Sequence, residues 1–151
     1  MSWPDTAERR WLGLLILLLW AISLILPVFT TCRPGSYYVE GYVLLMFGWY
    51  GLSVGAPAWI ANLFIVAIGG VLALGRRPWM LLGILCAAFT ACALWFTDWY
   101  SYGGAMPICH YYAGYWLWIA VGFIAAVIPI WLWQVMRGAK AKGENADTKE
   151  S

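Results

Sequence analysis

Four long apolar runs dominate the hydropathy pattern of this chain, and short polar or turn-forming segments separate them. The runs cover residues 11–29, 57–75, 79–96 and 112–135. A helix needs roughly 20 apolar residues to cross the ~30 Å hydrocarbon core of a bilayer. The pattern therefore predicts an all-α integral membrane protein, a four-helix bundle in which each run spans the membrane once.

The apolar stretch of residues 41–75 is too long for one span and too short for two. Pro57 is the natural break, because proline cannot donate a backbone hydrogen bond and suits the first turn of a new helix. The piece before it, residues 42–54, is short and rich in Gly and aromatic residues. We predict a short interfacial helix there, before the second span.

The composition agrees with a membrane environment. Hydrophobic residues make up 64% of the chain and charged residues 11%, whereas soluble domains carry roughly 25% charged residues. We expect one membrane domain, residues 1–137. The segment 138–151 is polar, small and charge-balanced, which predicts a disordered cytoplasmic tail.

The basic residues are distributed unevenly between the connections. The segments on one side of the predicted membrane contain only Arg33. The segments on the other side contain Arg9, Arg10, Arg76, Arg77, Arg137, Lys140, Lys142 and Lys149. Under the positive-inside rule, both termini face the cytoplasm (N-in, C-in) and the loops around Arg33 and Met106 face outward. We therefore expect a multi-pass protein of a bacterial inner membrane.

The first apolar run has two alternative interpretations, a signal peptide and a lipoprotein signal. Its apolar core is longer than a signal-peptide core, and no small-x-small cleavage site follows it. The residues before Cys32 lack the small and Leu positions that normally precede a lipidated cysteine. We therefore expect the run to remain as a span.

Small residues recur at intervals of four in two predicted spans. Gly83, Ala87 and Ala91 share one helix face, and so do Gly69 and Ala73. Helices in lipid associate through close packing of such residues. Packing within one chain is favoured over a homo-oligomer interface.

Cys32 and Cys109 fall in the two predicted outward loops, where an oxidising compartment permits a disulfide. Four spans with outward cysteines also suggest the quinone-linked oxidoreductases that make protein disulfides. Those enzymes use a C-x-x-C pair, which this chain lacks. We expect a structural disulfide rather than a catalytic one.

Other chemistry has little support in the sequence. His110 and Cys109 are adjacent, but zinc needs three or four ligands. No charged residue lies inside the predicted spans, which argues against proton-coupled transport. We expect no catalytic residue, metal, cofactor or nucleic-acid partner.

The most suggestive candidate site is a set of aromatic and polar residues on the predicted outer side. It comprises Tyr37, Tyr38, Glu40, Trp49, Tyr50, Asp98, Trp99, Tyr100 and His110. Aromatic surfaces bind lipid headgroups or partner proteins. The alternative is an aromatic belt that only anchors the helices in the interface.

Two short patterns carry a resemblance, Gly48-Trp49-Tyr50-Gly51 and Ala58-Trp59-Ile60-Ala61-Asn62. They resemble a family of small bacterial four-span inner-membrane proteins. The resemblance implies a similar helical arrangement and transfers no activity. Pro57 and Asn62 are expected to be structural, with Asn62 tying the interfacial segment to the second span by hydrogen bonds.

We therefore predict a non-enzymatic membrane protein that binds a partner protein or lipid through its outer aromatic cap. Two alternatives remain, a thiol-disulfide redox protein and an oligomeric transporter or channel component.

Overall fold

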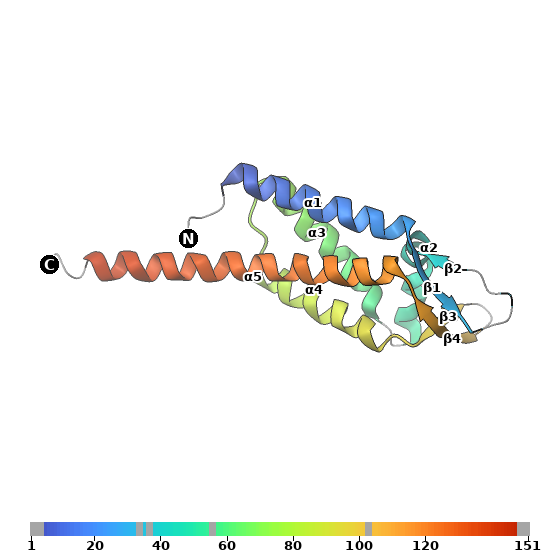
Figure 1. Ribbon diagram of the computed structural model, residues 1–151. Helices are drawn as coiled ribbons and strands as arrows, with labels where there is room; N and C mark the ends of the chain where they lie inside the picture. Colours follow the sequence, from blue (N-terminus) through green and yellow to red (C-terminus); the bar gives the residue numbers. More distant parts are fainter. Residues whose placement is uncertain (1–4, 33–34, 36–37, 55–56, 102–103, 148–151) are drawn as a thin grey trace.

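Four helices lie side by side in the computed structural model, and a small sheet covers one end of them (Figure 1). The structure describes residues 5–32, 35, 38–54, 57–101 and 104–147. The helical layer consists of α1 (Thr6–Ile25), α3 (Ala61–Ala73), α4 (Met80–Cys92) and α5 (Ala113–Asp147). The two ends of the chain lie away from the sheet, at the other end of the layer.

The sheet has four antiparallel strands in the order β2-β1-β4-β3. The strands are β1 (Pro27–Thr31), β2 (Tyr38–Glu40), β3 (Asp98–Ser101) and β4 (Gly104–Tyr111). Pro27 follows directly after α1 and cannot supply the amide that a continuing helix needs. The β-branched residues after it favour an extended chain, and Phe29 pairs with Tyr111 of β4.

The prediction of an all-α fold is therefore wrong. The apolar run of residues 11–29 is divided between a helix, which ends at Ile25, and strand β1. The segment predicted as the second outer loop contains β3 and β4, which pair with each other over residues 98–107. Pairing between β1 and β4 joins segments about 80 residues apart in the chain, a contact that local patterning does not reveal.

The prediction of four spanning helices is also wrong. Within the described residues, one helical segment, Ala113–Val135 of α5, is long and apolar enough to span a membrane. Helices α3 and α4 have 13 residues each, which corresponds to about 20 Å at 1.5 Å per residue. Helix α1 has 20 residues, but Glu8, Arg9 and Arg10 occupy its first turns.

The stretch before Pro57 forms short helical pieces. They are α2 (Gly41–Phe47) and the 3-10 helix η1 (Gly48–Val54), and a second 3-10 helix, η2 (Pro57–Ile60), leads into α3. Pro57 thus begins a new element, as its missing amide favours. We call residues 41–54 the lid, and the lid together with the four strands the cap.

The helices of the layer pack with their backbones close together. A Cβ atom added to Gly13 of α1 would lie 2.6 Å from the carbonyl oxygen of Gly69 in α3. A Cβ atom on Gly83 of α4 would lie 2.5 Å from the carbonyl oxygen of Ala126 in α5. Gly69 and Gly83, both in the predicted small-residue faces, thus lie at contacts within the chain.

Helix α5 continues to Asp147, into the segment for which the sequence predicts a disordered tail. Residues 138–147 include three Ala, two Lys and one Glu. These residue types have high helix propensity, which accounts for a continuing helix.

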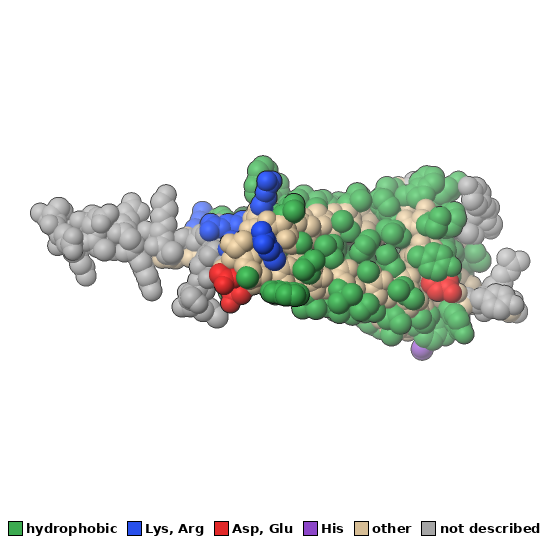
Figure 2. Space-filling view, turned by 90° about the horizontal axis from the view of Figure 1, so that it is seen from above, with side chains coloured by type: hydrophobic (Ala, Val, Ile, Leu, Met, Phe, Trp, Pro, Cys, Tyr) green, Lys and Arg blue, Asp and Glu red, His purple; other side chains and the backbone are tan. Residues whose placement is uncertain are grey.

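Basic side chains collect at the end of the layer that lies away from the sheet. Figure 2 shows Lys and Arg side chains, with acidic side chains near them, at one end of a body that is otherwise covered by hydrophobic side chains. The Arg9 guanidinium Nε donates to the carbonyl oxygen of Gly75 at 3.2 Å, which joins the start of α1 to the turn after α3. A cation near the C-terminal end of a helix is favoured by its dipole.

Candidate functional site

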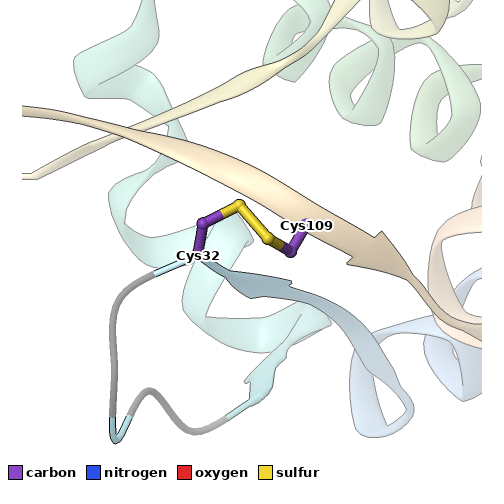
Figure 3. Close-up of a disulfide and its surroundings, with 2 residues drawn as sticks. All are labelled: Cys32 and Cys109. Atoms are coloured by element: carbon purple, nitrogen blue, oxygen red, sulfur yellow. A yellow bond between two sulfur atoms is a disulfide. The ribbon is translucent and has the colours of Figure 1, made fainter.

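A disulfide joins two neighbouring segments of the sheet, the end of β1 and strand β4 (Figure 3). Cys32 follows β1 and Cys109 lies in β4, with 5.0 Å between their Cα atoms. The Cys32 amide also donates to the carbonyl oxygen of Pro107 at 2.9 Å. The predicted disulfide is confirmed.

Three aromatic rings lie beside one another, those of Tyr38 in β2, His110 in β4 and Tyr112, which follows β4. The ring centroids of His110 and Tyr112 are 4.9 Å apart, and those of Tyr38 and Tyr112 are 6.2 Å apart, both edge to face. Tyr38 and His110 are exposed. We call these three residues the aromatic face.

The lid carries a second exposed aromatic group. The rings of Trp49 and Tyr50 in η1 are in contact at a tilt of 51°, with 4.8 Å between their centroids. Trp49 is exposed, as are Tyr42 and Met46 on the same segment. The lid therefore presents an aromatic and apolar outer surface.

The remaining residues of the predicted outer site belong neither to the aromatic face nor to the lid's exposed surface. Trp99 points inward and packs against Phe29, with 5.6 Å between ring centroids. Asp98 accepts a hydrogen bond from the Thr97 hydroxyl at 2.9 Å, and Glu40 stands at the N-cap of α2 without a side-chain capping bond. Tyr37 and the side chain of Tyr100 lie outside the described residues.

Asn62 lies at the point where three helices meet, buried except for 7% of its surface. Its Oδ1 atom accepts from the indole nitrogens of Trp20 at 2.9 Å and Trp118 at 2.8 Å. Its Nδ2 atom donates to the carbonyl oxygen of Trp59 at 3.1 Å. Asn62 therefore joins α3 to α1 and α5, whereas the sequence predicted a tie to the interfacial segment.

The tie to that segment is made by Trp59. Its indole nitrogen donates to the carbonyl oxygen of Leu45 in α2 at 2.9 Å, one of the last-turn carbonyls that lack a partner within a helix. A Cβ atom on Gly48 would lie 2.6 Å from the Trp59 ring. Gly48 thus leaves the space in which this ring lies against the lid.

Two tyrosines attach α5 and β4 to the end of α4. The Tyr115 hydroxyl donates to the carbonyl oxygen of Ala93 at 2.6 Å, and the Tyr111 hydroxyl donates to that of Phe96. Burial, and to a smaller extent the charge of Asp98, raises the pKa of Tyr111 above its ordinary value. A tyrosine hydroxyl is protonated at neutral pH, and the raised pKa keeps this one a donor to higher pH than usual.

Sequence reasoning did not identify Trp20, Trp118 or the two tyrosine hydroxyls as partners. The only local signal is Trp59 three residues before Asn62, which predicts that both lie on the same side of a helix. Across the described part of the chain, no group of three or more His, Cys, Asp or Glu residues is placed to hold a metal ion.

Comparisons with known proteins give no match, whether with family models, with curated proteins or with solved structures.

Proposed function

We propose that this protein is embedded in a membrane and holds its disulfide-closed cap at the oxidising surface, where the cap binds a partner protein. The observation that carries the proposal is an exposed apolar band that separates a basic end from the cap. Helix α5 is the membrane-crossing element in this proposal, and the apolar sides of the shorter helices contact acyl chains.

The band is made of aliphatic side chains on all four helices of the layer. Its exposed members include Leu14, Leu15, Leu18, Ile22, Leu63, Val66, Leu81, Ile84, Ile124 and Val127. Monomeric soluble proteins rarely expose contiguous apolar patches of more than a few hundred Å². A lipid environment removes the cost of exposing such a surface.

Exposed tryptophans lie at both edges of the band. Trp11 and Trp79 lie near the basic end, with 72% and 79% of their surfaces exposed. Trp95 and Trp116 lie near the cap, with 78% and 55% exposed. Tryptophan favours the headgroup region on each side of a bilayer, so these positions support a membrane between them.

Two independent features support an outward-facing cap. The positive-inside rule places the basic end in the cytoplasm. The Cys32–Cys109 disulfide belongs to an oxidising compartment, such as the bacterial periplasm. Both features support the proposal that the sheet lies on the outer side of a bacterial inner membrane.

The aromatic face and the outer side of the lid are the surfaces proposed to bind the partner. Tyr and Trp are enriched among the residues that contribute most to protein interfaces, because they bury large rings and also donate hydrogen bonds. The disulfide holds two strands of the sheet, so the face is preorganised and loses little entropy on binding. The resemblance of the Gly48 and Asn62 patterns to small four-span proteins adds no partner to this proposal.

Site-specific photo-crosslinking in intact cells tests the proposal. A photoreactive amino acid replaces Tyr38 or Trp49 in the cap, and replaces Trp11 at the opposite end as the matched control. We expect a single protein adduct from the cap positions and only lipid adducts from Trp11. The protein adduct should weaken when Cys32 and Cys109 are both replaced by Ser.

Lipid adducts alone at all three positions would contradict partner binding and favour an anchoring role for the aromatic residues. Exchange of the Cys32–Cys109 bond with a trapped substrate cysteine would instead indicate thiol-disulfide chemistry. Release of the intact protein from membranes by alkaline carbonate would contradict the membrane embedding itself.

A further inference from the structure

A partly open cavity lies between the lid and the ends of the helices. Its volume is about 90 Å³. The lid contributes Leu44, Leu45 and Gly48, and the opposite wall includes Phe96 and Trp118. The cavity therefore lies where the helical layer meets the cap, at the depth of the cap-side tryptophans.

Among the described residues that line this cavity, none carries a charged side chain. Its polar side chains include Ser23 and Tyr115, whose hydroxyls donate to the carbonyl oxygens of Trp20 and Ala93 at 2.6 Å each. Three further polar side chains belong to the hydrogen-bond network described above, namely Trp59, Asn62 and Trp118. Because these groups are bonded to the protein, a ligand meets an apolar lining and gains little from polar atoms of its own.

The volume limits what the cavity can hold. A cavity of roughly 150 Å³ lined by apolar side chains is large enough for benzene, and this one is smaller. A ring system or a folded peptide segment exceeds this space, whereas a few methylene groups of an unbranched chain fit it. Filling the cavity also restores the dispersion contacts that an empty cavity lacks.

We infer that the cavity binds a segment of one acyl chain from a membrane phospholipid. The outer side of the lid, with Tyr42, Met46 and Trp49 exposed, has the amphipathic character of an interfacial segment. Acyl chains are therefore the apolar groups at highest concentration beside the cavity. This inference rests on the proposed membrane embedding and does not depend on the partner protein.

Photolabelling of the purified full chain in phospholipid nanodiscs tests the inference. The probe is a phosphatidylcholine with a diazirine in one acyl chain, and the adducts are located by peptide mass spectrometry. We expect adducts on Leu44 or Leu45 as well as on the exposed band of the helices. The cavity adducts are the diagnostic ones, because the band is labelled by bulk lipid.

Ala58 lines the cavity, and replacing it with a large residue fills the space. Ala58→Phe is expected to lower the labelling of Leu44 and Leu45 at least fivefold while the labelling of the band stays unchanged. Ala67→Phe is the matched control, because Ala67 is exposed on α3. This control is expected to leave the cavity adducts unchanged.

Absence of cavity adducts in the wild-type protein would overturn the inference, as would cavity labelling that persists in folded Ala58→Phe protein. A monodisperse gel-filtration peak shows that the Ala58→Phe protein is folded. If it is not folded, Ala58→Leu replaces it in the same labelling experiment. If the protein is not embedded in the bilayer, the result differs, because the lipid probe then labels neither the band nor the cavity.

Discussion

The helical layer and the cap differ in what holds their parts together. In the layer, Gly13 and Gly83 let neighbouring helices approach until their backbones are in contact. In the cap, short strands are held by the Cys32–Cys109 disulfide and by the hydroxyl bond from Tyr111 to Phe96. The layer combines this close packing with the Asn62 hydrogen bonds at its cap end, whereas the cap has a covalent bond between its strands.

The proposed membrane embedding accounts for the difference. In that proposal lipid covers the outside of the layer, so burying an apolar side chain between helices gains little, and close van der Waals contact provides the association energy. A small sheet in water has few residues with which to build a core. Among the described residues of the cap, Phe29 is the one large side chain that is fully buried, and additional bonds compensate for this small core.

Loss of the disulfide should have the largest effect on stability. The bond closes a loop of 77 residues, and the chain-entropy relation gives a contribution of about 4 kcal/mol. Replacing both Cys32 and Cys109 by Ser should therefore make the cap unfold well before the helices. Limited proteolysis during a denaturant titration measures this, and Cys92→Ser, a free cysteine, is the control. If the helices and the cap of the Cys32→Ser, Cys109→Ser protein unfolded together, the idea that the two regions are held by different interactions would be contradicted.

Asn62→Leu acts at the boundary between the two regions. The substitution leaves the indole donors of Trp20 and Trp118 without their acceptor. Each buried donor without a partner costs about 1–3 kcal/mol, so we expect a loss of roughly 3 kcal/mol in the free energy of unfolding. Thermal denaturation in detergent measures the change.

A matched background separates this effect from a simple packing defect. In protein that already carries Trp20→Phe and Trp118→Phe, no indole donor remains to be orphaned. The same Asn62→Leu substitution should then cost much less, because replacing both partners by apolar groups is nearly neutral. An equal cost in the two backgrounds would show that the hydrogen bonds are unimportant.

Gly13→Ala tests the close packing of the layer. The added methyl group meets the backbone of α3 near Gly69, which cannot move away as a flexible side chain does. Overpacking of this kind costs about 1–3 kcal/mol. Gly70→Ala in α3 is the control, since a Cβ atom there has no neighbour within 4 Å. Chemical denaturation should show destabilisation in the first variant and little change in the second.

The smallest predicted effect concerns Tyr111 and pH. Its pKa is raised in the folded protein, so above about pH 10 the unfolded chain releases this proton first. The free energy of unfolding should consequently fall as the pH rises through that range. Tyr111→Phe should lose about 1 kcal/mol at neutral pH and show a shallower alkaline decrease. Identical pH profiles for the two proteins would exclude a contribution from this hydroxyl.

Several features of the fold were predicted correctly from local residues. The break at Pro57 follows from the missing amide of proline, and the disulfide follows from two cysteines predicted to lie in the same compartment. The contacts at Gly69 and Gly83 follow from small residues spaced by four. Each of these predictions uses the chemistry of one residue or one helical period.

The errors concern where the apolar runs end and what they pair with. Pro27 and Phe29 continue the first apolar run, so hydropathy alone assigns them to a helix, although they belong to β1. The predicted outer site was also only partly correct, because its residues do not all lie on the surface. Tyr38 and His110 are exposed, whereas Trp99 contributes to the core of the cap.

By itself, the sequence determined the apolar character of the chain, the basic end and the cysteine pair, because these depend on composition and on the order of residues. Only the tertiary structure decided that strands 27–31 and 104–111 pair, that Asn62 accepts from Trp20 and Trp118, and that a cavity lies beneath the lid. The physical reason is distance along the chain. Hydrogen bonds between residues 40 to 80 positions apart depend on how the whole chain closes, and no local pattern encodes that closure.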